Sequence, residues 1–182
     1  MNYGINSSAL KQIKEKASWF LALGIGLVIL GTLAILYSFM STIFSVEYLG
    51  FLFIVLGIFE GVQSFKLNLW GSFFLHLFLS VLYIASGIFI VTYPVLNAIT
   101  LTLFLAIFFF ISGIAKIIFA FTKKVPHKGW LVFNGALTIV LGILIWLEWP
   151  MSGLWVIGVL TGVNILFTGW TLIMLASMAK RI

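Results

Sequence analysis

The chain has 182 residues, of which 63% are hydrophobic and only 8% are charged, with a mean hydropathy of +1.27 and a net charge of +6. So few charged side chains cannot cover the surface of a soluble domain, whereas apolar runs of about 20 residues match the hydrocarbon thickness of a bilayer. There is no cysteine, which excludes disulfides, thiolate metal sites and cysteine nucleophiles. The composition predicts an all-α integral membrane protein.

Residues 1–17 are polar and carry three lysines. They predict a cytoplasmic N-terminal segment with a short amphipathic helix on the membrane surface. A basic segment before an apolar one is also typical of a signal peptide. The apolar run from Trp19 to Phe39 exceeds the usual h-region of about 7–15 residues, so we expect it to stay as the first span.

Residues 18–182 are expected to form one transmembrane domain of six helices. The apolar runs place these spans at about 18–38, 44–65, 70–92, 98–121, 130–149 and 153–178.

The even-numbered spans share columns of small residues that recur every 56 positions. The columns are Gly50, Gly57 and Ser64, then Ala106, Gly113 and Ala120, then Gly162, Gly169 and Ala176. Seven residues are nearly two helical turns, so each column follows one helix face. Gly61 adds a Gly-x3-Gly pattern with Gly57, which is typical of closely packed membrane helices. Packing within one chain is the favoured interpretation, because every repeat carries the columns, and self-association into a homo-oligomer is the alternative.

The odd-numbered spans repeat as well. Gly24, Ser80 and Gly135 correspond, as do Gly31, Gly87 and Gly142, and the spans end at Tyr37-Ser38, Tyr93-Pro94 and Trp149-Pro150. These correspondences define three repeats at about 18–65, 70–121 and 130–178. We expect each repeat to be a helical hairpin of an odd helix, an aromatic-Pro turn and an even helix, with all three repeats parallel in the membrane.

The positive charges predict the orientation. Nine of the ten Lys and Arg residues precede the first span, follow an even span or close the chain, and the opposite loops contain none. This asymmetry predicts that both termini are cytoplasmic. The basic loops lack a nucleic-acid motif, so their expected partner is anionic lipid at the cytoplasmic face.

Several of these features together resemble a known family. They are the six spans in three repeats, the turns at residues 93–94 and 149–150, the Gly-Ile segments at residues 57 and 113, and the run from Gly135 through Gly142 to Trp149-Pro150. This combination resembles the HdeD family of small bacterial acid-resistance membrane proteins over nearly the whole chain after residue 17. One departure is Ser38, where the other two repeats carry proline. The resemblance implies a cytoplasmic-membrane location and a link to acid stress, and it supplies no catalytic motif.

Three ionisable residues lie inside the predicted spans, namely Glu60, His76 and Lys116. Each costs roughly 3 kcal/mol to place in a membrane, so such residues often mark function. All three lie about 9–10 Å below the cytoplasmic ends of their helices, and together with Gln63 and Asn134 they predict one polar layer. Glu60 and His76 are equidistant in sequence from the loop centre, so we expect them to face each other. For Lys116, snorkelling toward the headgroups is an equally good interpretation.

Other chemistry is absent from the sequence. His76 and His127 have no nearby carboxylate pair, so we expect no metal site, and no phosphate loop, serine triad or paired catalytic carboxylates predict a cofactor or an enzyme. Two function classes remain. The first is a non-enzymatic acid-stress protein that acts through packing or a pH-sensitive polar layer. The alternative is a small transporter or channel for protons or small solutes.

Overall fold

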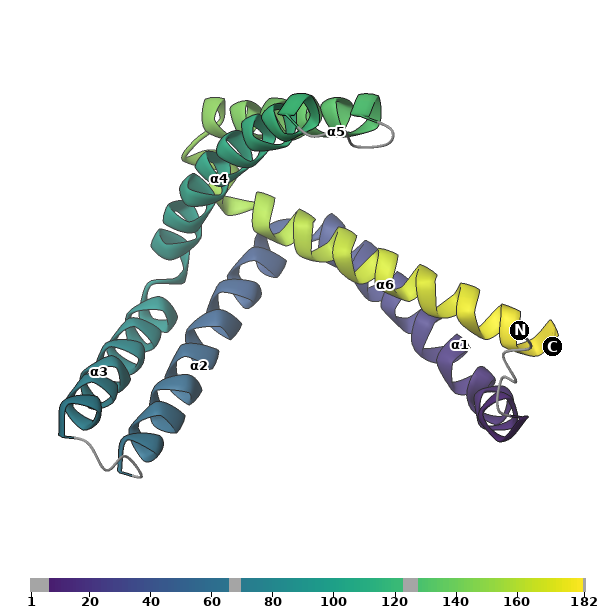
Figure 1. Ribbon diagram of the computed structural model, residues 1–182, viewed down its shortest axis with the longest axis horizontal. Coiled ribbons are helices and arrows are strands. Elements are labelled where there is room, and N and C mark those ends of the chain that lie inside the picture. The colour runs from purple at the N-terminus through teal and green to yellow at the C-terminus, as the bar shows by residue number, and fades with distance from the viewer. Residues whose placement is uncertain (1–6, 66–69, 123–127, 182) are drawn as a thin grey trace. The chain divides into compact units, whose positions relative to one another are not determined.

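The computed structural model describes residues 7–65, 70–122 and 128–181, which are helical almost throughout (Figure 1). The elements are α1 (Ser7–Leu36), α2 (Ser38–Ser64), α3 (Trp70–Thr92), α4 (Pro94–Thr122), α5 (Lys128–Leu147), the 3-10 helix η1 (Met151–Leu154) and α6 (Val156–Arg181). Each of the six α-helices is long and apolar enough to cross a membrane. The prediction of an all-α, multi-pass membrane protein is therefore confirmed.

The N-terminal segment differs from its prediction. Helix α1 begins at Ser7 and runs continuously to Leu36, so no break separates a surface helix from the first span. The polar residues and the apolar run contain no proline and no turn signal between them, and a helix continues where nothing interrupts its backbone hydrogen bonds. A separate short amphipathic helix is not confirmed, and the side chains of its lysines lie outside the described residues.

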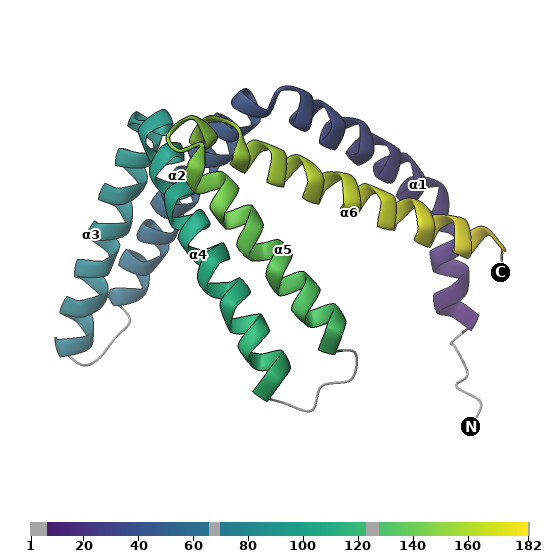
Figure 2. The ribbon, with the colours of Figure 1, turned by 90° about the horizontal axis from the view of Figure 1, so that it is seen from above.

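The helices belong to two compact units. One unit comprises Met1–Ser41 and Gly158–Ile182, and so contains α1 and most of α6. The other comprises Thr42–Ile157 and contains α3, α4, α5 and most of α2. Within these units the long helices lie side by side as the pairs α1–α6, α2–α3 and α4–α5 (Figures 1 and 2).

The small-residue columns form the contact line of all three helix pairs. A Cβ atom added to the central glycine of each even helix would meet a backbone carbonyl of the partner helix. It would lie 2.9 Å from Ser80 O for Gly57, 2.7 Å from Gly135 O for Gly113, and 2.7 Å from Gly24 O for Gly169. Only a residue without a side chain allows this approach, which is how membrane helices gain van der Waals packing. The three pairs thus use equivalent positions.

A second contact, one heptad away, fixes the direction of each pair. Gly50 faces Gly87 O, Gly142 faces Ala106 O, and Gly162 faces Gly31 O, at 2.9–3.0 Å from the would-be Cβ atom. From the first contact to the second, the residue number falls by seven on the even helix and rises by seven on the odd helix in every pair. All three pairs are therefore antiparallel, and their registers are equivalent.

The predicted hairpins are not confirmed, because the close partners come from different repeats. An even helix packs against the odd helix of the next repeat, and α6 of the last repeat packs against α1 of the first. Single residues, Tyr37 and Tyr93, join the two helices of the first and second repeats. A closely packed antiparallel hairpin needs about 2–5 connecting residues. One residue gives a corner, and both tyrosine amides still bond back four residues, to Leu33 O and Phe89 O.

The third connection is built differently, around η1. The indole Nε1 of Trp149 donates to Ile99 O at 3.2 Å, and the hydroxyl of Ser152 donates to Ile145 O at 2.8 Å. Gly153 packs directly on Ile99, with a would-be Cβ atom 2.6 Å from its Cα atom. These contacts fix the end of α5 against the start of α4.

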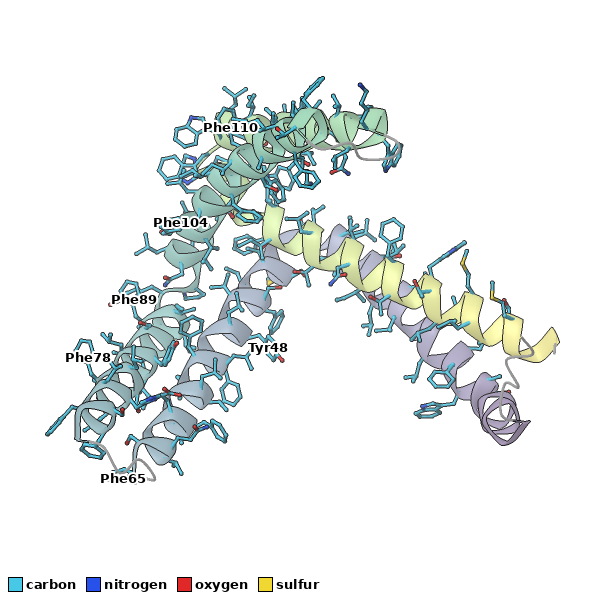
Figure 3. All side chains as sticks on the ribbon, in the orientation of Figure 1. Tyr48, Phe65, Phe78, Phe89, Phe104 and Phe110 are labelled. Atoms are coloured by element: carbon cyan, nitrogen blue, oxygen red, sulfur yellow. The ribbon has the colours of Figure 1, made fainter. Side chains whose placement is uncertain are left out.

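Large side chains cover the outside of the helix pairs. Phe78 and Phe89 point away from α2 on the free side of α3, and Tyr48 points away from α3 on the free side of α2 (Figure 3). The three are 50–64% exposed, whereas the buried positions of α2 carry Thr, Val, Gly and Ser. Small residues inside and large apolar residues outside are the arrangement expected of helices whose solvent is lipid.

Candidate functional site

The α2–α3 pair brings Glu60 and His76 into direct contact. Oε1 of Glu60 lies 2.5 Å from Nδ1 of His76, and the two side chains are 24% and 35% exposed. Glu60 follows Gly57 by three residues, and His76 precedes Ser80 by four, so both flank the closest approach of the two helices. The predicted antiparallel placement therefore brings these two groups together, although they lie on different repeats.

Contact at this distance requires a proton between the two atoms. A carboxylate oxygen and an unprotonated ring nitrogen both present lone pairs, so one of them must carry the hydrogen. With an ionised Glu60 the proton lies on Nδ1, and the pair has a net charge of −1 or 0 depending on whether Nε2 is also protonated. A further proton on the carboxylate makes the net charge +1. Three net charges are thus compatible with this contact.

The backbone beside this contact is also held by a polar bond. The hydroxyl of Ser80 donates to Gly57 O across the helices at 2.7 Å and is buried. A Cβ atom on Gly61 would lie 2.7 Å from the same hydroxyl oxygen. The sequence pattern does not reveal this bond, because a serine and a glycine satisfy the same packing column equally well.

The α4–α5 pair holds Lys116 in a different polar contact. Its Nζ donates to Asn134 Oδ1 at 2.8 Å and to Thr138 Oγ1 at 3.2 Å. The hydroxyl of Thr138 donates in turn to Asn134 O at 2.7 Å. Thr138 lies one turn further from the start of α5 than Asn134, so the amine is directed across the helix pair and not toward the helix end. This arrangement differs from snorkelling.

The residues of the expected polar layer form two separate contact sets. Within the part of the chain that the structure describes, no hydrogen bond or ion pair joins Glu60 or His76 to Lys116. Gln63 lies on the exposed side of α2 and has no hydrogen-bond partner among the described residues. The α6–α1 pair carries Leu172 at the equivalent position, so each of the three helix pairs differs chemically there. His127, the second histidine, lies outside the described residues.

The remaining features offer little catalytic chemistry. Among the described residues, no group of three or more His, Cys, Asp or Glu side chains could hold a metal ion. A hollow of about 310 Å³ opens between α4 and α5, and its lining is apolar. The lining residues are Ala106, Ile107, Phe110, Gly142, Ile143 and Trp146.

Comparison with protein families supports the repeat directly. The model of a short repeat of unknown function, DUF308, matches twice, at residues 22–92 and 78–147. The chain belongs to this family. The two DUF308 matches begin 56 residues apart, at residues 22 and 78, which is the spacing of the small-residue columns. Each match ends at the last residue of an odd helix, Thr92 of α3 or Leu147 of α5. No curated protein and no solved structure matches the chain.

The extent of the DUF308 matches agrees with the observed pairing. The first match contains the whole α2–α3 pair, and the second contains the whole α4–α5 pair. A unit that includes both an even helix and the following odd helix includes a complete glycine contact line. The repeat of the family therefore corresponds to a packed helix pair together with the last 15 residues of the helix before it, 22–36 of α1 or 78–92 of α3.

Proposed function

We propose that the protein is a non-enzymatic component of acid-stress protection, as in HdeD-type proteins, and that the Glu60–His76 contact is its pH-sensitive element. The DUF308 match supports the proposal, because HdeD proteins carry this repeat. The observation that carries it is the direct contact of a carboxylate with an imidazole between two apolar helices.

Acid acts on this contact through charge. Histidine is the side chain that ordinarily changes charge between about pH 5 and 8. A charge in a low-dielectric membrane costs several times more than in water, so each change in the net charge of the pair favours a different depth, hydration or spacing of α2 and α3. The nearest other acidic side chain on these helices is Glu47, 13 residues and about 20 Å along α2. No other acidic side chain of α2 or α3 therefore lies within contact distance of the pair.

Survival of cells after acid challenge tests the proposal. Glu60→Gln and His76→Phe each remove one titrating group, and both are expected to reduce protection while the membrane holds the normal amount of folded protein. His127→Gln is the matched control, because it removes the other histidine and leaves the contact intact. If Glu60→Gln and His76→Phe are made at normal levels and protect as well as the parent, the contact is structural and the proposal fails.

The transporter alternative has its own measurement. Purified protein in proteoliposomes, given a pH gradient, would carry protons or small acids across the bilayer if the polar contacts lined a path. The acid-stress proposal expects no flux above that of empty liposomes. Flux that disappears in Lys116→Met and in Glu60→Gln would favour the transporter and would contradict a purely responsive role.

A further inference from the structure

Helices α4 and α5 hold a positive charge without a negative partner of their own. Neither helix contains an aspartate or a glutamate, and Lys116 is the one ionisable residue of α4. The acceptors that hold its amine, Asn134 Oδ1 and Thr138 Oγ1, are neutral. One carboxylate, that of Glu60, lies in the cytoplasmic half of the described spans, and it contacts His76. The ammonium charge is therefore solvated locally but not neutralised.

Two hydrogen-bond donors remain at this position. An ammonium has three N–H bonds, of which Lys116 uses two. The Asn134 oxygen must face the ammonium, because the amide nitrogen is a donor and cannot accept, so Nδ2 points elsewhere. That Nδ2 has no partner among the described residues. One cationic donor and one amide donor thus lie next to each other, which is the arrangement that binds two oxygens of one anion.

The other two helix pairs serve as internal controls. At the positions equivalent to Asn134 and Thr138, α3 carries Leu79 and Tyr83, and α1 carries Leu23 and Leu27. A side-chain amide at the Asn134 position therefore occurs only in the pair that carries a lysine, and leucine replaces it in both other pairs. The packing columns are the same in all three pairs, so close packing does not require these polar residues.

We propose that Lys116 and Asn134 form a binding site for a phosphate oxyanion, supplied by the headgroup of an anionic phospholipid. Asn134 is exposed and Lys116 half-buried on a helix pair whose solvent is the bilayer, so lipid has direct access to them. Both residues lie six positions from a helix end, about 9 Å. The 29-residue α4 is about 44 Å long and so exceeds the hydrocarbon core of about 30 Å, which places Lys116 near the headgroup boundary. The proposal is independent of the acid-stress function, since it concerns a different helix pair.

The test compares two lysine variants that remove the same charge. The full chain is purified in detergent, and its melting temperature is measured with added phosphatidylglycerol, phosphatidylcholine or inorganic phosphate. A ligand that binds the folded state raises the melting temperature. Phosphatidylglycerol is expected to raise it more than phosphatidylcholine does in the parent and in Lys128→Gln, whose lysine is exposed at the first residue of α5. Lys116→Met should lose most of this gain.

Further measurements distinguish a lipid headgroup from free phosphate and control for poor folding of Lys116→Met. Asn134→Leu keeps the positive charge and should lose part of the gain, so it reports on the site even if Lys116→Met folds poorly. A gain with inorganic phosphate that Lys116→Met abolishes supports the oxyanion site with a soluble source instead of lipid. An undiminished gain in Lys116→Met, or an equal loss in Lys116→Met and Lys128→Gln, overturns the proposal, because general electrostatics would then explain lipid binding.

Discussion

Replacing Gly113 with alanine tests the packing of the helix pairs most simply. The added Cβ atom would lie 2.7 Å from Gly135 O and 2.9 Å from Ile139 N, both backbone atoms. Ordinary contact begins at 3.4 Å, so the shortfall at the carbonyl is 0.7 Å (3.4 minus 2.7). The backbone cannot yield without moving a helix, and overpacking of this kind costs about 1–3 kcal/mol.

Gly26→Ala is the matched control. It lies in the interior of α1, and a Cβ atom there would meet nothing within 4 Å. Both substitutions carry the same gain in helix propensity of about 1 kcal/mol, so their difference isolates the clash. Unfolding in mixed micelles, followed by tryptophan fluorescence, should show Gly113→Ala less stable than Gly26→Ala by about 1–3 kcal/mol. Equal stability of the two variants would refute the account of the contact line.

Three further outcomes are expected. Thr102 has a buried hydroxyl without a hydrogen-bond partner in the described part of the chain, and Val46 is its equivalent in the first repeat. Thr102→Val should therefore raise the free energy of unfolding by about 1–3 kcal/mol. A lower free energy of unfolding would show that the hydroxyl has a hydrogen-bond partner. Ser80→Ala should lower the free energy of unfolding by about 0.5–1.5 kcal/mol, because the hydrogen bond to Gly57 O on α2 is lost. An unchanged free energy of unfolding would show that this bond does not stabilise the fold. Single cysteines at Met151 and Lys128, both exposed, should be labelled by an impermeant reagent from outside and inside the cell respectively; labelling of both from one side would overturn the topology.

The contact line itself could be predicted from the sequence, because its cause is local. Glycine at residues 57, 113 and 169 repeats at a fixed spacing, and heptad spacing places each column on one helix face whatever the partner. The meeting of Glu60 and His76 could also be predicted, since the two helices are consecutive and antiparallel, and equal distances from a short loop imply equal depth.

The identity of the partner helices could not be predicted in the same way. Every odd helix carries the same small columns, so the packing pattern alone is compatible with several pairings. The expected hairpins paired the two helices of one repeat, whereas the closest contacts join helices of different repeats. The one-residue corners at Tyr37 and Tyr93 prevent close packing of the two helices that they join. A Tyr-Pro or Tyr-Ser pair in an apolar run does not reveal that only one residue lies outside the helices. Thr138 was missed because a threonine in an apolar helix ordinarily bonds its own backbone, which it also does here.

The protonation of His76 in the assembled protein is the most direct test of the functional account. His127→Gln leaves His76 as the only histidine, and its ring nitrogens can be followed by NMR in lipid nanodiscs between about pH 8 and 5. The account predicts that the ring gains a proton within this range and that Glu60→Gln changes the titration, because the carboxylate lies 2.5 Å from Nδ1. A ring whose protonation is constant across the range, or unaffected by Glu60→Gln, would contradict the claim that this contact senses acid.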